Sequence, residues 1–380
     1  MPYLPNMKTG HYILLIALLI ISSCSRYENI KGVYVLLQAP EIRQRYGGEM
    51  GALADELKEA HVSLVISPTM EHGTAYYPSD VLPKRWEYGT QLLALRHELR
   101  RRDIRFAAYI PVFTDAYAYR AQPGLRAVND YGSRNGSEQQ HAVCPNNPEY
   151  QSYKLEAIEE VILILQPDIV YLDNLFFPVN PLYICPENST NNIRSYCFCS
   201  SCLQAFQEHS QIVLPQGQST ADIAAEILEH HETEWIQWKC ETITSFMEKA
   251  SKTIHTVNPD CKIMLSVLPW KEKQLHSGRK RLSGQDVKTL APFVDYFTLL
   301  PCPFQTGQFD SALSSVVSDL QVTERRVIPS IEMRNYRPTE LGNEFYFQRS
   351  LQHFQHNVII SDWGYLLKNR PYLNTFISEP

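Results

Sequence analysis

A short apolar segment in the middle of the chain ends on a carboxylate. Residues 169–172 are Ile-Val-Tyr-Leu, which is typical of a buried strand, and Asp173 follows them directly. Burying an unpaired charge costs free energy, so the strand itself has no need of an ionisable side chain there. In a barrel of parallel strands, the carboxyl ends of the strands open into the active site. Asp173 is therefore our first candidate for catalysis, and a helix cap or an ion pair with an arginine is the structural alternative.

A second carboxylate occupies a similar place in a later segment. Glu332 follows the apolar run 327–331, so its side chain is expected at the same mouth as Asp173. Glycosidic bonds are hydrolysed by two carboxyl groups that flank the bond, one as general acid and the other as nucleophile or base. We therefore predict that Asp173 is the nucleophile or base and that Glu332 is the general acid.

Further carboxylates and aromatic residues follow other apolar segments. Together on one rim they suit carbohydrate chemistry, because aromatic rings offer apolar faces on which sugars stack. The residues that we predict to bind substrate are Asn174, Trp270, Asp362, Trp363, Asp115 and Glu71. For Trp270 and Trp363, packing at the barrel rim is an equally open alternative.

Eight apolar segments alternate with helical ones along the chain. The predicted strands are 32–38, 61–67, 104–112, 169–172, 262–268, 294–299, 326–331 and 357–361. The predicted helices include 50–60, 88–102, 147–165 and 220–257. This alternation favours an α/β fold of the (β/α)8 TIM-barrel class over an open doubly wound sheet. No glycine-rich nucleotide loop follows any of the predicted strands, which argues against the open, nucleotide-binding alternative.

The N-terminal segment has the pattern of an export signal. A charged start, an apolar run at 13–21 and small residues precede Cys24, and the run is too short to span a bilayer. The sequence Ile21-Ser22-Ser23-Cys24 resembles a bacterial lipobox. We predict a lipoprotein signal peptide at 1–23, lipidation of Cys24, a short tether at 24–30 and a barrel at 31–380. An ordinary secretory signal or a membrane anchor is the alternative.

The export signal predicts a lipid-anchored protein of the cell envelope. Ser25 follows the lipobox cysteine, and a residue other than Asp at this place favours the outer membrane. The net charge of −6 and the lack of basic blocks argue against nucleic acid as a partner. The sequence contains neither the histidine spacing of a catalytic zinc site nor the G-x-S-x-G of a serine hydrolase. We therefore expect no cofactor, and the expected partners are a carbohydrate and the membrane.

A cysteine-rich loop at 179–202 is predicted to follow the fourth strand. Its cysteines could be four ligands of a structural metal, and they are Cys185, Cys197, Cys199 and Cys202. In an exported chain the same residues could equally form disulfides. Free thiols are the third possibility, and all three imply stabilisation of a loop.

Several motifs together resemble the bacterial glycosyl-hydrolase-like barrel family. They are the strand at 31–35, the loop at 75–83, the stretch at 122–132, the helix start at 144–149, the strand end at 172–178, the segment at 197–206, Trp235 and Trp238, and the stretch at 284–295. The resemblance covers most of residues 31–363. It implies a (β/α)8 fold, hydrolysis of an unknown poly- or oligosaccharide, and a catalytic role for Asp173.

The sequence thus predicts a glycoside hydrolase anchored to the cell envelope. The alternative from another class is a non-catalytic, carbohydrate-binding lipoprotein on a degenerate barrel, which the fold alone cannot distinguish. A third hypothesis is an envelope scaffold whose cysteine-rich loop binds a protein partner.

Overall fold

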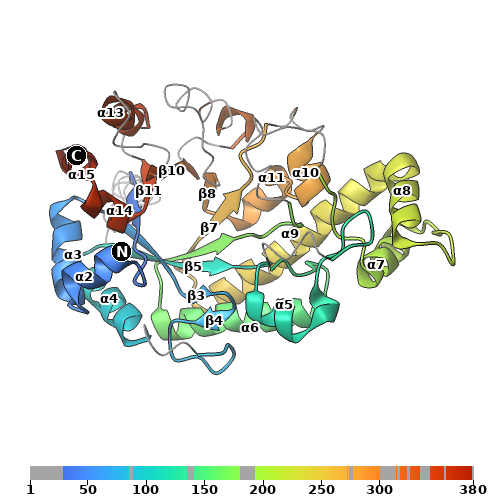
Figure 1. Cartoon of the computed structure of the whole chain (residues 1–380), viewed down its shortest axis with the longest axis horizontal. Helices are drawn as coiled ribbons and strands as arrows, with labels where there is room; N and C mark the ends of the chain where they lie inside the picture. The colour runs from blue at the N-terminus through green and yellow to red at the C-terminus, as the bar shows by residue number, and fades with distance from the viewer. Residues whose placement is uncertain are drawn as a thin grey trace, which may run out of the picture.

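The computed structural model shows a parallel barrel surrounded by helices (Figure 1). It describes residues 29–84, 89–134, 141–179, 193–271, 273, 277–299, 314, 317–322, 326–333, 343–354 and 357–378. The predicted signal peptide, Cys24 and Cys185 lie outside these residues. None of the helices within them is long and apolar enough to cross a membrane.

Nine of the described strands form one parallel sheet that curls into a barrel. Its order is β10-β11-β1-β2-β5-β6-β7-β8-β9. The strands are β1 (Lys31–Tyr34), β2 (Leu64–Pro68), β5 (Arg105–Pro111), β6 (Ile169–Asp173), β7 (Lys262–Val267), β8 (Tyr296–Leu299), β9 (Val327–Ile328), β10 (Ser330–Glu332) and β11 (Val358–Ser361). The antiparallel hairpin of β3 (Met70–Glu71) and β4 (Thr74–Ala75) follows β2. The predicted TIM-barrel class is confirmed.

Pro329 explains why nine strands make an eight-stranded barrel. The strand predicted at 326–331 is divided at this residue into β9, which pairs with β8, and β10, which pairs with β11. Proline has no backbone N–H to donate to a neighbouring strand. Its carbonyl oxygen still accepts a hydrogen bond of 2.9 Å from the backbone N–H of Ile359. The six-residue stretch from Val327 to Glu332 therefore joins the two edges of the sheet and closes the barrel.

Helices cover the outside of the barrel. On the side of the N-terminus they are α2 (Pro40–Tyr46), α3 (Met50–Glu59), α4 (Gly89–Arg101), α13 (Asn343–His353), α14 (Trp363–Lys368) and α15 (Arg370–Ser378). The others are α5 (Ala116–Ala121), η2 (Pro123–Leu125), α6 (Pro148–Leu165), α7 (Ser200–Ser210), α8 (Thr220–His230), α9 (Glu232–Val257), α10 (Gly278–Ser283), α11 (Val287–Leu290) and η5 (Ala291–Phe293). α7 and α8 project from the side opposite α2 and α3 (Figure 1).

The boundaries of two helices follow from their capping residues. α6 begins after Asn147, whose side-chain oxygen accepts a hydrogen bond of 2.8 Å from the backbone N–H of Tyr150. Pro148 is tolerated in the first turn because its missing N–H would have no partner there. The helical region predicted at 220–257 is instead two helices, because the chain leaves helical geometry at His231 between α8 and α9.

The barrel interior is lined by every second residue of each strand, because successive side chains point to opposite faces. A separate apolar cluster fills it, and its members are Ile30, Leu64, Ile66, Ala107, Ile169, Tyr171, Met264, Tyr296, Ile328 and Ile359, with Tyr34 and Tyr109 packed against them. Residues of the other parity pack outward against the helices in the main core. Asp173 and Glu332 share the parity of Ile169 and Ile328, so both side chains face the interior at the carboxyl ends of β6 and β10.

Candidate functional site

Asp173 lies buried at the inner mouth of the barrel, with hydroxyl groups directed at both of its carboxylate oxygens. Ser266 on β7 donates to Oδ1, and Tyr109 on β5 donates to Oδ2. The side-chain amide of Asn174 also donates to Oδ2, at 3.3 Å. Donors from both neighbouring strands therefore fix the orientation of the carboxyl group.

Asn174 bends the chain away from the strand just after Asp173. Its φ is +53°, in the left-handed region that asparagine tolerates better than most residues. The side chain of Asn174 is thereby directed back at its neighbour, as the hydrogen bond to Asp173 shows. The predicted contact of Asn174 with substrate stays a prediction, and its observed contact is with the carboxylate.

Burial raises the pKa of Asp173 above its ordinary value of 3.8. Hydrogen bonds from Ser266, Tyr109 and the backbone of Asn174 lower the pKa and offset part of that effect. The carboxyl group therefore ionises at a higher pH than an exposed aspartate does. Perturbed titration of this kind is frequent at functional sites.

The structure brings Glu332 to the same end of the barrel as Asp173. It is the last residue of β10, and its Oε2 accepts a hydrogen bond of 3.2 Å from the Ser361 hydroxyl on β11. The pKa of Tyr34 on β1 is raised chiefly by burial. The negative charges of Asp173 and Glu332 raise it further. Two carboxyl groups from different strands thus both raise the pKa of one phenol at the mouth.

Three tyrosines lie beside Asp173 in the barrel interior. Tyr34, Tyr109 and Tyr171 have ring centroids 5.3 to 6.3 Å apart. Burial raises the pKa of each, so all three phenols keep their protons. Sequence reasoning missed Tyr109 and Ser266 as contacts of the carboxylate. The signal that could have found them is a hydroxyl at an inward position of a strand that is otherwise apolar.

Asp115, a predicted substrate-binding residue, is fully buried and bound to its own protein. It is the N-cap of α5, where its Oδ1 accepts from the backbone N–H of Ala118 at 2.8 Å. Its Oδ2 lies 3.4 Å from the Lys154 ammonium and 3.3 Å from the Tyr150 hydroxyl. Burial lowers the pKa of Lys154, and the negative charge of Asp115 opposes that shift. These contacts are those of a structural ion pair.

Glu71 and Asp362 also have partners within the protein. Glu71 lies on the β3–β4 hairpin and accepts a hydrogen bond from the hydroxyl of Tyr76. Asp362 is the N-cap of α14 and accepts from the backbone N–H of Tyr365 at 2.9 Å. Binding of substrate by Asp115, Glu71 and Asp362 stays a prediction, and the observed contacts account for each residue structurally.

Both predicted stacking tryptophans are buried. Trp270 has no exposed surface and packs with Phe176, Leu268 and Leu282. Trp363 likewise has none, and its indole N–H donates to the Tyr46 hydroxyl at 3.1 Å. Neither ring has an exposed face on which a sugar could stack in this structure. Both rings are instead packed within the protein, as in the alternative of packing at the barrel rim.

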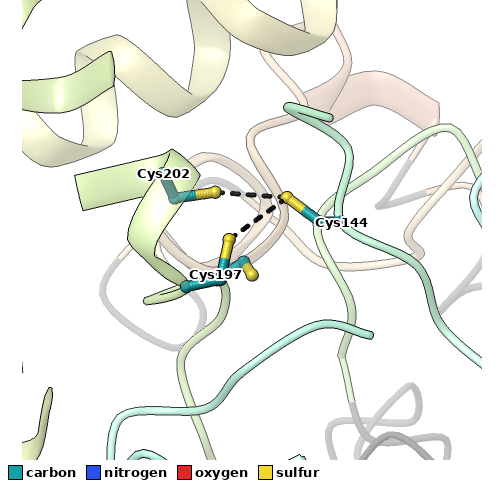
Figure 2. A group of neighbouring side chains, drawn as sticks. Cys144, Cys197 and Cys202 are labelled. Atoms are coloured by element: carbon teal, nitrogen blue, oxygen red, sulfur yellow. Dashed lines mark hydrogen bonds between the residues drawn. The ribbon is translucent and has the colours of Figure 1, made fainter. Parts of the chain in front are cut away.

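A cluster of four cysteines lies beside the loops that follow β5 and β6. The sulfurs of Cys144, Cys197, Cys199 and Cys202 are all within 4.8 Å of one another (Figure 2). The thiols are free, so the structure joins no two of these four in a disulfide. Sequence reasoning selected Cys185 in place of Cys144. The missed signal is that Cys144 precedes α6 and so lies in the loop next to the one that carries the other three.

A hollow of about 600 Å³ lies on the outside of the barrel between α6, α7 and α9. Gln151, Glu208 and Trp238 are among the residues that line it. None of the candidate carboxylates contributes to its walls, so this hollow is separate from the candidate site at the barrel mouth.

Comparisons with known proteins support the fold. No protein-family model matches the sequence, and no curated protein matches it. The glycoside hydrolase domain of PgaB (BpsB) from Bordetella bronchiseptica is similar in structure, with a TM-score of 0.65 and 15% identity. The alignment covers 92% of this chain and 98% of that domain.

Two larger enzymes are similar over part of their length. They are Gan42B, a GH42 β-galactosidase from G. stearothermophilus (TM-score 0.61, 12% identity), and α-L-fucosidase isoenzyme 2 from Paenibacillus thiaminolyticus (0.60, 14%). The alignments cover 93% and 91% of this chain but only 56% and 49% of those chains. The chain therefore has a glycoside-hydrolase-like (β/α)8 fold and spans about half the length of these two enzymes.

The buried pair of Asp115 and Lys154 yields a test of stability. Replacing Asp115 with Ala leaves a buried ammonium unpaired, and we expect unfolding to become about 3–5 kcal/mol more favourable. Urea unfolding followed by circular dichroism measures this change. Asp55→Ala is the control, because Asp55 pairs with Arg102 at the surface and should change stability little. An Asp115→Ala protein of unchanged stability that has lost affinity for glycans would instead assign Asp115 to substrate binding.

Proposed function

We propose that this protein is a glycoside hydrolase that cleaves a poly- or oligosaccharide with Asp173 and Glu332. The observation that supports this most directly is that both carboxyl groups face the barrel interior at its carboxyl end. Hydrolysis of a glycosidic bond requires two carboxyl groups on opposite sides of the anomeric carbon. The similarity to a glycoside hydrolase domain over nearly all of both chains agrees with this proposal.

Asp173 is proposed as the nucleophile or base. Among the described residues, the side chains that form hydrogen bonds to it are all donors. They are the Ser266 and Tyr109 hydroxyls and the Asn174 amide. Such donors favour the ionised form of a carboxyl group, which is the form that attacks the sugar or activates a water.

Glu332 is proposed as the general acid. In the barrel, two strands, β7 and β8, lie between β6 and the β9–β10 stretch that carries Glu332. This separation along the sheet supports a pair that acts on opposite faces of a sugar ring. Glu332 would give its proton to the leaving oxygen while Asp173 acts at the anomeric carbon.

The protein is further proposed to be exported and anchored to the cell envelope through Cys24. The support for this is the apolar run at 13–21 followed by the lipobox sequence. Expression in bacteria fed a labelled fatty acid should yield a labelled protein, and Cys24→Ser should remove the label. A wild-type protein that is exported without label would leave an ordinary secretory signal.

Replacing Asp173 with Asn should lower hydrolysis by about 10²–10⁴-fold, because the side chain can no longer ionise. Initial rates on a panel of polysaccharides and aryl glycosides measure this loss. Stability should be maintained, since the neutral amide avoids the cost of burying a charge. The matched control is Asp168→Asn at the opposite end of β6, where the carboxylate accepts from the backbone N–H of Phe106 at 2.8 Å. If the wild-type protein binds glycans but cleaves none, the non-catalytic alternative holds.

The pH dependence of hydrolysis tests the role of Asp173. Activity that needs the ionised carboxylate is lost as the pH falls through its pKa, and burial raises that pKa above 3.8. Ser266→Ala removes a donor that lowers the pKa, so the acidic limb of kcat/KM should move to higher pH. Thr298→Val is the control, because the Thr298 hydroxyl lies on the adjacent strand without a partner among the described residues. A shift of the alkaline limb alone would make Asp173 the general acid.

A further inference from the structure

We propose that Cys144, Cys197, Cys199 and Cys202 bind one zinc ion as a structural site. The four sulfurs lie within 4.8 Å of one another, and Figure 2 shows three labelled side chains that point toward a common centre. Four thiolates are the ligand set of closed, structural zinc sites, in which no position is left open for a substrate. The site is separate from the candidate carboxylates and does not depend on the proposed hydrolysis.

The distances between sulfurs agree with a tetrahedral ion. A Zn–S bond of about 2.3 Å places the sulfurs of a regular tetrahedron about 3.8 Å apart. Cys144 Sγ lies 3.5 Å from Cys199 Sγ and 3.4 Å from Cys202 Sγ. The sulfurs thus already enclose a space close in size to a zinc site, and a small outward movement completes the geometry.

A pair of disulfides explains the same cluster less well. A disulfide joins two sulfurs about 2.05 Å apart and pairs each cysteine with one partner only. Cys144 instead lies almost equally far from two partners, as a ligand does when three others surround the same ion. Cys197 and Cys199 are separated by one residue, a spacing suited to two ligands of one ion.

The surroundings of the cluster suit an anionic metal–thiolate group. All four cysteines are buried, at most 6% exposed, so water has little access to the sulfurs. The backbone N–H of Val128 donates to Cys197 Sγ at 3.3 Å, as groups around a metal site commonly do for its ligands. Cys199 is the N-cap of α7 and Cys202 lies in its first turn, where the helix dipole favours negative charge.

The ion would hold together two loops at the mouth of the barrel. Cys144 belongs to the segment between β5 and α6, whereas the other three precede or begin α7, after β6. Single backbone contacts already join these loops, such as Phe198 N–H to Val128 O at 2.9 Å. Bound zinc would add four strong bonds to these contacts and so fix the chain that follows the strand of Asp173.

Metal analysis of the whole purified chain tests this proposal. We expect about one zinc per chain by mass spectrometry of the metals, after dialysis against a metal-free buffer. Chain refolded with Co²⁺ alone should show the intense visible absorption of tetrahedral cobalt bound by thiolates. Both readouts are independent of hydrolysis, and Asp173→Asn should leave them unchanged.

Single substitutions identify the ligands. Cys144→Ser and Cys199→Ser should lower the zinc content at least tenfold and abolish the cobalt spectrum. Cys240→Ser and Cys261→Ser are the matched controls, because these cysteines are also buried and free but lie outside the cluster, so both should keep the metal. If a cluster variant fails to fold, alkylation of the wild-type protein tests the proposal instead. Zinc should protect the four cluster thiols from alkylation until a chelator is added.

Three results would overturn the proposal. The first is a wild-type protein that contains no zinc, binds no Co²⁺ and keeps all cluster thiols reactive. The second is loss of the cluster thiols to disulfides, detected by mass after alkylation of the unfolded chain without reductant. The third is iron in place of zinc, which tetrahedral thiolate sites can also hold.

Discussion

The closed parallel barrel is the constraint on which the rest of the structure depends. Because side chains alternate along each strand and the strands run in one direction, the parity of a residue decides whether it faces the interior or the helices. Closure through the stretch from Val327 to Glu332 brings β10 into this scheme even though Pro329 interrupts its strand. Two carboxylates far apart in sequence therefore reach the same mouth of the barrel.

Two buried aspartates differ in the groups that compensate their negative charge. Asp115 is matched by the Lys154 ammonium, by a backbone N–H and by a phenol, so its charge is balanced where it lies. Asp173 is faced by neutral donors, which orient it but do not cancel its charge, and its pKa is raised by burial. A carboxylate that is held in place but not neutralised retains the capacity to react with something else, which is why Asp173 remains the candidate for chemistry.

The sequence predicts the fold well because hydrophobic periodicity is a local signal. Strand positions, the start of α6 and the inward placement of Asp173 and Glu332 follow from residues close to each of them. The break at His231 between α8 and α9 was missed, since neither glycine nor proline marks it in the sequence. The partners of Asp173 were missed because Tyr109 and Ser266 lie on neighbouring strands 64 and 93 residues away. The burial of Trp270 and Trp363 depends likewise on packing that adjacent residues do not determine.

The chain that follows β6 links the candidate site to the cysteine cluster. A strand is held by regular hydrogen bonds to both neighbours, whereas the described residues 193–199 meet the loop after β5 through contacts such as Asp130 N–H to Ser195 O at 3.1 Å. Ordering such a chain costs conformational entropy, which buried apolar residues such as Phe177 and Phe198 offset in part. Strong local bonds can meet that cost, and a metal site provides more of them per residue than hydrogen bonds do. Four cysteines from two adjacent loops would therefore stabilise the part of the barrel mouth that the sheet itself cannot reach.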